Sequence, residues 1–319
     1  MNRKFSKPFA ASVVFVAMCL FVFICWGFGE TFIPPISKGT RWSTPTAVKA
    51  ETVNANVASV QTIPVEKVKK CTAKTIHLST KSLPITGLVS FPGSGNTWSR
   101  HLIQQISGLG TSSCYCDENL HNSGFPFECH TDKSKTLVVK AHEIECYENY
   151  RFQKVVLLIR NPYDALLSYA NFAKGGHTGR PSKPILIKGA QKMFPYALIR
   201  YIYLTHETIK TVTGPVHVLQ YELLKTNMAN TLTKLADFLN VNVTQRDIAC
   251  TIKLQEGNFY RKVSEAEHIA ELKEVYKKEQ LLEMKRAADI TEEMLRTAYN
   301  VDLDIGWSPL ERLLFDEES

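Results

Sequence analysis

A loop rich in glycine and hydroxyl side chains is the first feature of the sequence that could bind an anion. It reads Phe91-Pro92-Gly93-Ser94-Gly95-Asn96-Thr97-Trp98 and follows the apolar run Ile85–Val89. Where a strand opens into such a loop and then a helix, backbone N–H groups and the helix N-terminus can point at a phosphate. No lysine follows Gly95, so the Walker pattern of ATPases, GTPases and P-loop kinases is absent. The loop therefore predicts phosphate binding of another kind.

A second unit of the same type lies further along the chain. The apolar run Val155–Ile159 ends in Arg160, and Ser168 lies in the helix that Pro162 is expected to start. A guanidinium and a hydroxyl at such a position can make charge-assisted hydrogen bonds to a second phosphate. Together the two units predict an enzyme that holds a doubly phosphorylated nucleotide at both ends.

These motifs resemble those of the sulfotransferases that use 3′-phosphoadenosine 5′-phosphosulfate (PAPS). That family's phosphosulfate loop is usually written Tyr-Pro-Lys-Ser-Gly-Thr-Thr-Trp, and here it stands as FPGSGNTW. The segment RNPYDALLSYANF resembles the family's 3′-phosphate element, Lys140-Ala141-His142 its Lys-Thr-His, and Phe259-Tyr260-Arg261-Lys262 its Phe-x-Arg-Lys. The resemblance covers residues 85–262 and is closest to the WSC-domain-containing (WSCD) group, although no Cys-rich WSC module is seen in front.

The resemblance implies a role for each matching residue. His142 would be the general base that takes the proton of the acceptor hydroxyl, with Lys140 as a second catalytic residue. PAPS would be the co-substrate, and no metal ion is expected. The residues that would bind PAPS are Gly93, Ser94, Gly95, Asn96, Thr97, Trp98, Arg160, Ser168, Tyr221, Arg261 and Lys262. In that set Trp98 and Tyr221 would lie at the adenine, and Arg160, Ser168, Arg261 and Lys262 at the 3′-phosphate.

One departure from the family pattern leaves an alternative open. Cytosolic members carry a lysine at the position of Gly93, where it neutralises charge on the leaving phosphate. Either Lys140 or Arg100 replaces that cation, or the chain is a catalytically inactive binding or scaffolding protein that keeps the nucleotide fold. Glu143 is a second candidate base. With His142 as the base, the rate is expected to fall with a midpoint near or somewhat below neutral pH.

The globular part alternates strands and helices. Such alternation predicts an α/β fold, a P-loop-type parallel sheet flanked by helices, in which ligands bind at the carboxyl ends of the strands. Residues Gly108–Lys135 are expected to form a loop. The expected strands are Ile85–Phe91, Thr136–Val139, Lys154–Ile159 and Val216–Gln220. The expected helices are Asn96–Ser107, one from Pro162, Pro195–Thr211, Glu222–Leu239, and two within Ser264–Asn300 capped at Ser264 and Thr291.

The N-terminal part predicts a membrane anchor. A basic start precedes the uncharged apolar stretch Phe9–Phe28, which at ~20 residues can cross a bilayer and offers no small-residue cleavage site. Residues 1–8 are then a cytoplasmic tail, 9–29 a transmembrane signal anchor, 30–75 a luminal stem expected to be disordered, and 76–319 the catalytic domain. This order predicts a single-pass type II protein of the Golgi membrane with a luminal catalytic domain.

Cysteine usage fits a luminal domain. Six of the eight cysteines follow the anchor, and an even number in an oxidising compartment predicts disulfides whose connectivity the sequence leaves open. Zinc held by Cys114, Cys116, Cys129 and His130 is the alternative, although C-x-C is not a usual zinc spacing. The sequon Asn242-Val243-Thr244 permits N-glycosylation.

Composition narrows the class of partner. The 319-residue chain has a net charge of +7, which suits an anionic cofactor or an acidic glycan and suits a plain solvated surface equally well. No dense basic tract interleaved with aromatic residues occurs, so nucleic acid is not an expected partner. The sequence therefore predicts a luminal sulfotransferase that acts on a hydroxyl group, most simply on a glycan. The WSCD resemblance alone suggests a sialic-acid-bearing acceptor, and a homodimer is left open.

Overall fold

The computed structural model describes residues 68–303, apart from residues 69, 144, 259–264 and 302. The predicted tail, the predicted anchor and most of the predicted stem lie outside the described residues. Within the described part, none of the helices has the length and apolar character needed to span a membrane.

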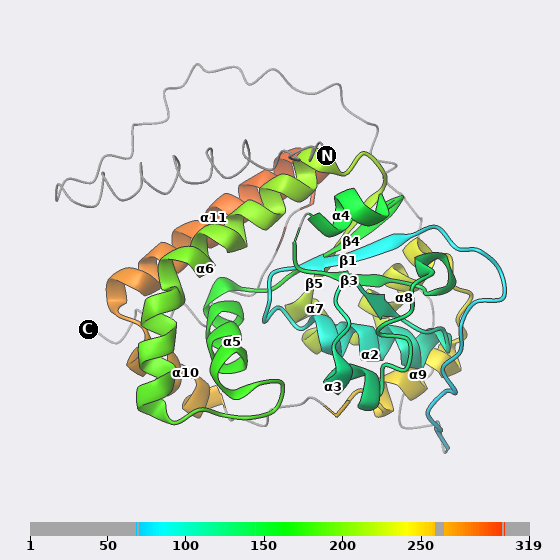
Figure 1. The fold of residues 1–319 in the computed structure, drawn as a ribbon, viewed down its shortest axis with the longest axis horizontal. Helices are drawn as coiled ribbons and strands as arrows, with labels where there is room; N and C mark the ends of the chain where they lie inside the picture. Colours follow the sequence, from blue (N-terminus) through cyan, green and yellow to red (C-terminus); the bar gives the residue numbers. More distant parts are fainter. Residues whose placement is uncertain (1–67, 69, 144, 259–264, 302, 304–319) are drawn as a thin grey trace, which may run out of the picture. The chain divides into compact units, whose positions relative to one another are not determined.

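Five parallel strands form the sheet of the described domain, in the order β2-β3-β1-β4-β5 (Figure 1). The strands are β1 (Thr86–Ser90), β2 (Ser112–Ser113), β3 (Val139–Ala141), β4 (Lys154–Ile159) and β5 (Val216–Gln220). Every neighbouring pair runs parallel. Parallel strands need crossover connections, here mostly helices, and the central strand β4 is buried at every residue and apolar from Val155 to Ile159. The predicted parallel sheet is confirmed.

Helices cover both faces of the sheet, and the side chains of each strand alternate between two hydrophobic cores. Val155 and Leu157 of β4 enter one core, whereas Val156 and Leu158 enter the other. The first core is closed by α4 (Glu145–Tyr150), α5 (Pro162–Gly175), α6 (Lys183–Thr211), α10 (Glu265–Val275) and α11 (Lys278–Tyr299). The second is closed by α2 (Asn96–Ser107), α7 (Tyr221–Thr226), α8 (Met228–Leu239) and α9 (Gln245–Lys253).

Two helices differ from the sequence expectation. Helix α6 begins at Lys183, and Pro195, expected to start it, lies inside it. Phe194 and Ala197, on either side of Pro195, are both buried, and the packing of this helix outweighs the cost of an interior proline, about 3 kcal/mol. The expected helix Glu222–Leu239 is broken at Asn227, whose φ of −141° ends α7 before α8 begins.

Further differences concern a strand, a loop and a cap. The strand expected at Thr136–Val139 is found at Val139–Ala141. The expected loop Gly108–Lys135 contains β2, the short helix α3 (Glu118–Asn122) and a 3-10 turn at Lys133–Lys135. Thr291, expected as a cap, lies buried within α11, where its hydroxyl donates to the carbonyl of Ala287 at 2.8 Å. A threonine hydroxyl can be satisfied by the preceding turn, so its presence does not require a helix start.

The carboxyl ends of four strands meet at one edge of the sheet. Val89 pairs with Ala141, Ser90 with Leu158, and Ile159 with Gln220. The segments that follow these strands are therefore neighbours: the loop at residues 91–95, then His142, Arg160 and Tyr221. Each carries a residue singled out from the sequence, so this edge is the candidate site.

Candidate functional site at the carboxyl edge of the sheet

The loop after β1 has a conformation that requires glycine at two positions. Gly93 and Gly95 both have φ of +91°, in the left-handed region. A Cβ atom on Gly93 would lie 2.4 Å from the carbonyl oxygen of Ala165 and 2.8 Å from the amide nitrogen of Tyr169, both in α5. A lysine, which the sulfotransferase resemblance led us to expect at this position, does not fit this backbone. The close packing of the loop on α5 therefore requires glycine at position 93.

The loop delivers unpartnered donors at the start of α2. Gly95 caps this helix without a side-chain hydrogen bond, and within the described part no acceptor is seen for the first-turn N–H groups of Asn96, Thr97 and Trp98. The Ser94 hydroxyl is buried and has no partner among the described residues. Such a helix start favours an anion.

The side chain of Asn96 does not face this anion site. It is buried, and its amide donates to the carbonyl of Leu88 and to the hydroxyl of Ser90, both at 3.0 Å. Only its backbone N–H remains available at the start of α2. The predicted contribution of Asn96 is thus restricted to the backbone.

Tyr221 brings together three of the other predicted residues. A Cβ on Gly95 would lie 2.5 Å from the Tyr221 ring, so this ring rests directly on the glycine. The Arg160 guanidinium lies over the same ring, 4.3 Å from its centroid, and Trp98 meets it edge-on at 5.4 Å. The Trp98 indole also donates to the carbonyl of Gln255 at 2.8 Å, which fixes its orientation. These contacts join the ends of β1, β4 and β5.

Arg160 and Ser168 meet at the same glycine loop. Arg160 donates to the Gly93 carbonyl at 2.9 Å, and the Cβ of Ser168 lies 3.3 Å from where a Cβ on Gly93 would be. Arg160 also donates to Asp164 at 3.3 Å, while its Nε is buried with no partner among the described residues. The structure therefore places Gly93, Arg160 and Ser168 together. Arg261 and Lys262 lie outside the described residues, and their roles stay predictions.

His142 lies at the end of β3 in a defined orientation. Its Nδ1 is 2.8 Å from the carbonyl oxygen of Ser90 and must donate to it, which leaves a lone pair on Nε2. The Tyr115 ring stacks on the imidazole at 5.9 Å, and the Tyr115 oxygen accepts the His142 amide proton at 2.9 Å. This neutral tautomer is the form that a general base needs.

The pH expectation for His142 needs correction. Burial and the nearby Lys140 ammonium lower the pKa of His142 to about 3. The imidazole therefore stays neutral far below neutrality, and a rate loss with a midpoint near pH 7 is not expected from this group. The larger cause is tertiary, because it is desolvation by burial, and Lys140, two residues earlier in β3, adds to it.

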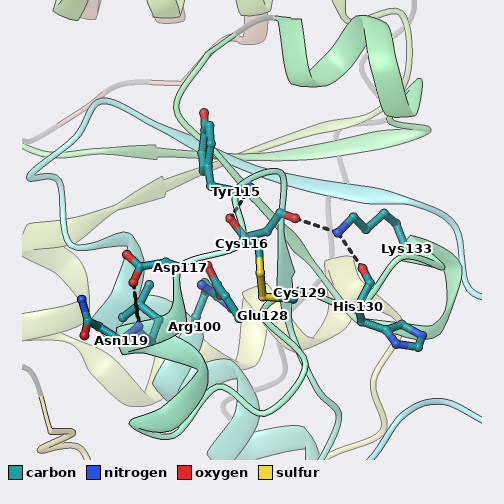
Figure 2. Close-up of a disulfide and its surroundings, with 11 residues drawn as sticks. Arg100, Tyr115, Cys116, Asp117, Asn119, Glu128, Cys129, His130 and Lys133 are labelled. Carbon is teal, nitrogen blue, oxygen red and sulfur yellow. Dashed lines mark hydrogen bonds and ion pairs between the residues drawn. A yellow bond between two sulfur atoms is a disulfide. The ribbon is translucent and has the colours of Figure 1, made fainter.

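Of the two cations proposed to replace the loop lysine, only Lys140 remains. Arg100 is fully buried in an ion pair with Glu128 at 2.5 Å, donates to Thr111 at 2.9 Å and lies over the Phe125 ring. Figure 2 shows this pair beside a disulfide bond. Arg100 is thus committed to the protein interior, and its proposed role as a replacement is wrong.

Lys140, unlike Arg100, is buried without a charged partner among the described residues. It is 7% exposed, and burial lowers the pKa of its ammonium group. No hydrogen bond or ion pair of this ammonium is seen within the described part of the chain. A buried cation without a partner is costly, and an anion would relieve that cost. Lys140 is therefore the remaining candidate for charge neutralisation.

Of the six cysteines among the described residues, four form disulfides and two are free thiols. The bonds join Cys71 to Cys250 and Cys116 to Cys129. Because Cys116 and Cys129 bind each other, the zinc alternative is excluded, and no other metal-binding group of His, Cys, Asp and Glu is found in the described ranges. The Cys71–Cys250 bond fastens residue 71, within the predicted stem, to α9. Cys114 and Cys146 are free and contact each other.

Three further residues belong to this edge although sequence reasoning did not assign them. Asp164 binds Arg160, and the only feature of the sequence that could have indicated this contact is the spacing of four residues between them. His268 of α10 binds Asp164, and Tyr115 supports His142 by accepting its amide proton. In Figure 2 the Tyr115 side chain points away from the Cys116–Cys129 disulfide. Glu143, the second candidate base, pairs with Arg200 at 3.0 Å. Long-range contacts of this kind leave no pattern in the sequence.

Known proteins share sequence with the part of the chain that forms this site. Residues 86–289 match the family model described as the sulfotransferase domain. A WSCD family member of Aedes aegypti is 36% identical over 188 residues, which are 58% of this chain and 59% of that relative. A WSCD family member of Drosophila melanogaster is 35% identical over 192 residues, which are 59% and 60% of the two chains. The match thus spans about three fifths of the length of these curated relatives.

A solved structure also shows similarity. It is the crystal structure of mouse sulfotransferase SULT7A1 complexed with PAP, with a TM-score of 0.45 and 16% sequence identity. The alignment covers 72% of this chain and 87% of that one.

Proposed function

Because this chain belongs to the sulfotransferase domain family, we propose that it transfers a sulfuryl group from PAPS to an acceptor hydroxyl. One observation carries the proposal: the unpartnered donors of the glycine loop, Arg160 and His142 converge on the carboxyl edge of one parallel sheet. A doubly phosphorylated nucleotide needs donors at both ends, and a transfer reaction needs a base nearby.

The residues present fit such a nucleotide. The buried, unpartnered hydroxyl of Ser94 and the uncapped start of α2 offer donors to the 5′-phosphosulfate. Arg160, with an unpartnered Nε, and the neighbouring Ser168 offer donors to the 3′-phosphate. Tyr221 contacts Gly95 and the Arg160 guanidinium, and Trp98 meets its ring edge-on, so these two aromatic side chains are the candidates for contact with the adenine.

The chain's own groups perform two tasks in the proposed reaction. PAPS supplies the sulfuryl group and a phosphate leaving group. The Nε2 lone pair of His142 accepts the acceptor's proton, since Nδ1–H is held by the Ser90 carbonyl. Lys140 and the N–H groups at the start of α2 stabilise negative charge, which requires no metal in principle.

The acceptor and the location extend this proposal. We propose a glycan hydroxyl as acceptor, on a sialic-acid-bearing chain in keeping with the similarity to WSCD family members, and a type II location in the Golgi membrane. Two disulfides suit an oxidising lumen, and the exposed Asn242 is accessible to glycosylation. The net charge of +7 is compatible with an acidic acceptor. A homodimer remains a prediction that the elution volume of the purified protein would test.

A catalytically inactive binding protein is the second candidate. Gly93 favours it, because the usual lysine is absent and the backbone cannot accommodate it. Such a protein would bind the nucleotide but would not transfer a sulfuryl group. The oriented His142 and the unpartnered Lys140 favour the enzyme instead, since binding alone requires no base.

Two measurements test the proposal. Adenosine 3′,5′-bisphosphate should raise the melting temperature, whereas ATP, which lacks a 3′-phosphate, should not. Arg160→Ala and Ser168→Ala should each weaken that binding by roughly 1.5–3 kcal/mol in folded protein. Transfer of labelled sulfate from PAPS to a glycan panel then separates an enzyme from a binding protein. A protein that binds ATP as well as the bisphosphate would contradict the proposal.

A further inference from the structure

A chain of charged contacts leads away from Arg160 to a helix far along the sequence. Asp164, in the first turn of α5, accepts from Arg160 at 3.3 Å through one carboxylate oxygen. Its other oxygen lies 2.5 Å from Nε2 of His268, which belongs to α10. Arg160 and Asp164 are each 15% exposed and His268 is 26% exposed, so the chain is largely shielded from water.

Asp164 is ionised and firmly held in this arrangement. Burial by itself would raise the pKa of Asp164, but Arg160 and the hydrogen bond from His268 outweigh burial and hold that pKa far below its usual range. Asn161 adds a third donor to the carboxylate at 3.1 Å, and its own side chain caps α5. With one oxygen engaged by Arg160 and Asn161 and the other by His268, the carboxylate cannot rotate freely.

A second acidic side chain, beside Asp164, influences Arg160. Glu222, in α7, lies close enough to influence Arg160 and accepts two hydrogen bonds from Asn161, both at 3.0 Å. The guanidinium has therefore to be oriented toward a phosphate while being drawn toward protein carboxylates. A carboxylate fixed by a third group leaves the guanidinium fewer orientations.

We propose that His268 is a positioning residue of the nucleotide site, which acts through Asp164 to orient Arg160 toward the 3′-phosphate. This inference rests on the proposed function and adds a residue to it. Helix α10 thereby contributes to nucleotide affinity. If His268 had only a structural role, its contact with Asp164 would hold α10 against α5 and would affect folding but not nucleotide affinity.

The test compares variants of His268 in binding two nucleotides. His268→Phe removes the donor, and His268→Gln keeps a donor at the position of Nε2. We expect His268→Phe to raise the Kd for adenosine 3′,5′-bisphosphate roughly 2- to 30-fold, the range for residues that act through another. His268→Gln should restore most of the affinity. The Kd for adenosine 5′-phosphate, which has no 3′-phosphate, should not change.

Two controls separate positioning from folding. Glu274→Gln breaks the exposed contact of α10 with Lys183 of α6 at 2.7 Å and should leave both affinities unchanged. In an Arg160→Ala background, His268→Phe should cause no further loss, because the two residues act on the same phosphate. Should His268→Phe not fold, His268→Asn serves, because its amide is too short to reach Asp164.

Three results of these binding measurements would overturn the inference. An unchanged Kd for the bisphosphate in folded His268→Phe or His268→Asn would overturn the inference and leave the proposed function intact. Equal weakening of both nucleotides would overturn it as well, since the effect would not pass through Arg160. A wild-type protein that binds neither nucleotide would overturn the proposed function and this inference together.

Discussion

His142 makes a quantitative prediction about pH. Burial and the Lys140 ammonium lower the pKa of His142 to about 3 in the native state, whereas an ordinary histidine titrates near 6.5. The unfolded chain therefore binds more protons than the native chain between these values. Stability must fall as the pH falls, because protonation of the unfolded state is favoured.

The magnitude follows from the two pKa values. Between pH 7 and pH 5 the difference in protonation should cost about 2 kcal/mol of unfolding free energy for this one group. His142→Gln cannot titrate, so its loss of stability over the same interval should be about 2 kcal/mol smaller than that of the wild type. Urea unfolding at the two pH values, followed by fluorescence, measures both proteins.

His217 provides the matched control. It lies in β5, stacks on Phe238, and burial lowers its pKa to about 4. His217→Gln should therefore flatten the pH dependence of stability by a similar amount, although the residue has no part in the site. Only His142→Gln should lower turnover, by about 10²–10⁴-fold, with nucleotide affinity nearly intact.

Two results would refute this reasoning. A stability profile of His142→Gln parallel to that of the wild type would mean that the native imidazole titrates normally. Near-wild-type turnover in His142→Gln, with a loss in Glu143→Gln, would pass the role of base to Glu143. If His142 is the base, kcat/KM should show no acid limb near pH 7 from this group.

Three further predictions follow from the packing. Gly93→Ala should weaken nucleotide binding at least tenfold and destabilise the fold by roughly 1–2 kcal/mol, because its φ is +91° and the added Cβ would overlap α5; unchanged binding in calorimetry would contradict this. Arg100→Met should lower the free energy of unfolding in urea by roughly 3–5 kcal/mol, because it leaves Glu128 buried and unpaired. Adding Glu128→Gln to this variant should recover part of that loss. If the costs of the two substitutions simply add, the two side chains do not stabilise each other. Peptide mapping without reductant should find Cys114 and Cys146 alkylated only after unfolding, whereas a bond between them would show a third disulfide.

Local order along the chain made most of the fold predictable. Short apolar runs such as Val155–Ile159, each followed by a helical pattern, indicate parallel strands with crossover helices, and the sheet has this form. The start of α6 was missed because proline is usually read as a helix start, and the buried residues on both sides of Pro195 could not be known. The break at Asn227 likewise depends on packing on either side of it.

The candidate site was predictable in part for a topological reason. The carboxyl ends of parallel strands lie at one edge, so residues that follow strand ends, such as His142, Arg160 and Tyr221, must be neighbours. The fate of Arg100 was not predictable, because its spacing in α2 does not reveal that Glu128 lies opposite it in the interior. Nor was the inward direction of the Asn96 side chain.

The sequence by itself determined the kind of molecule: the order of strands and helices, the glycine loop, and the residues placed at strand ends. These depend on neighbouring residues and on the chirality and hydrogen bonding of the backbone, which local patterns record. Only the tertiary structure decided the protonation of His142 and the contact of His268 with Asp164, which lie 104 positions apart. Burial and long-range pairing depend on which elements cover a side chain, and no local pattern specifies that.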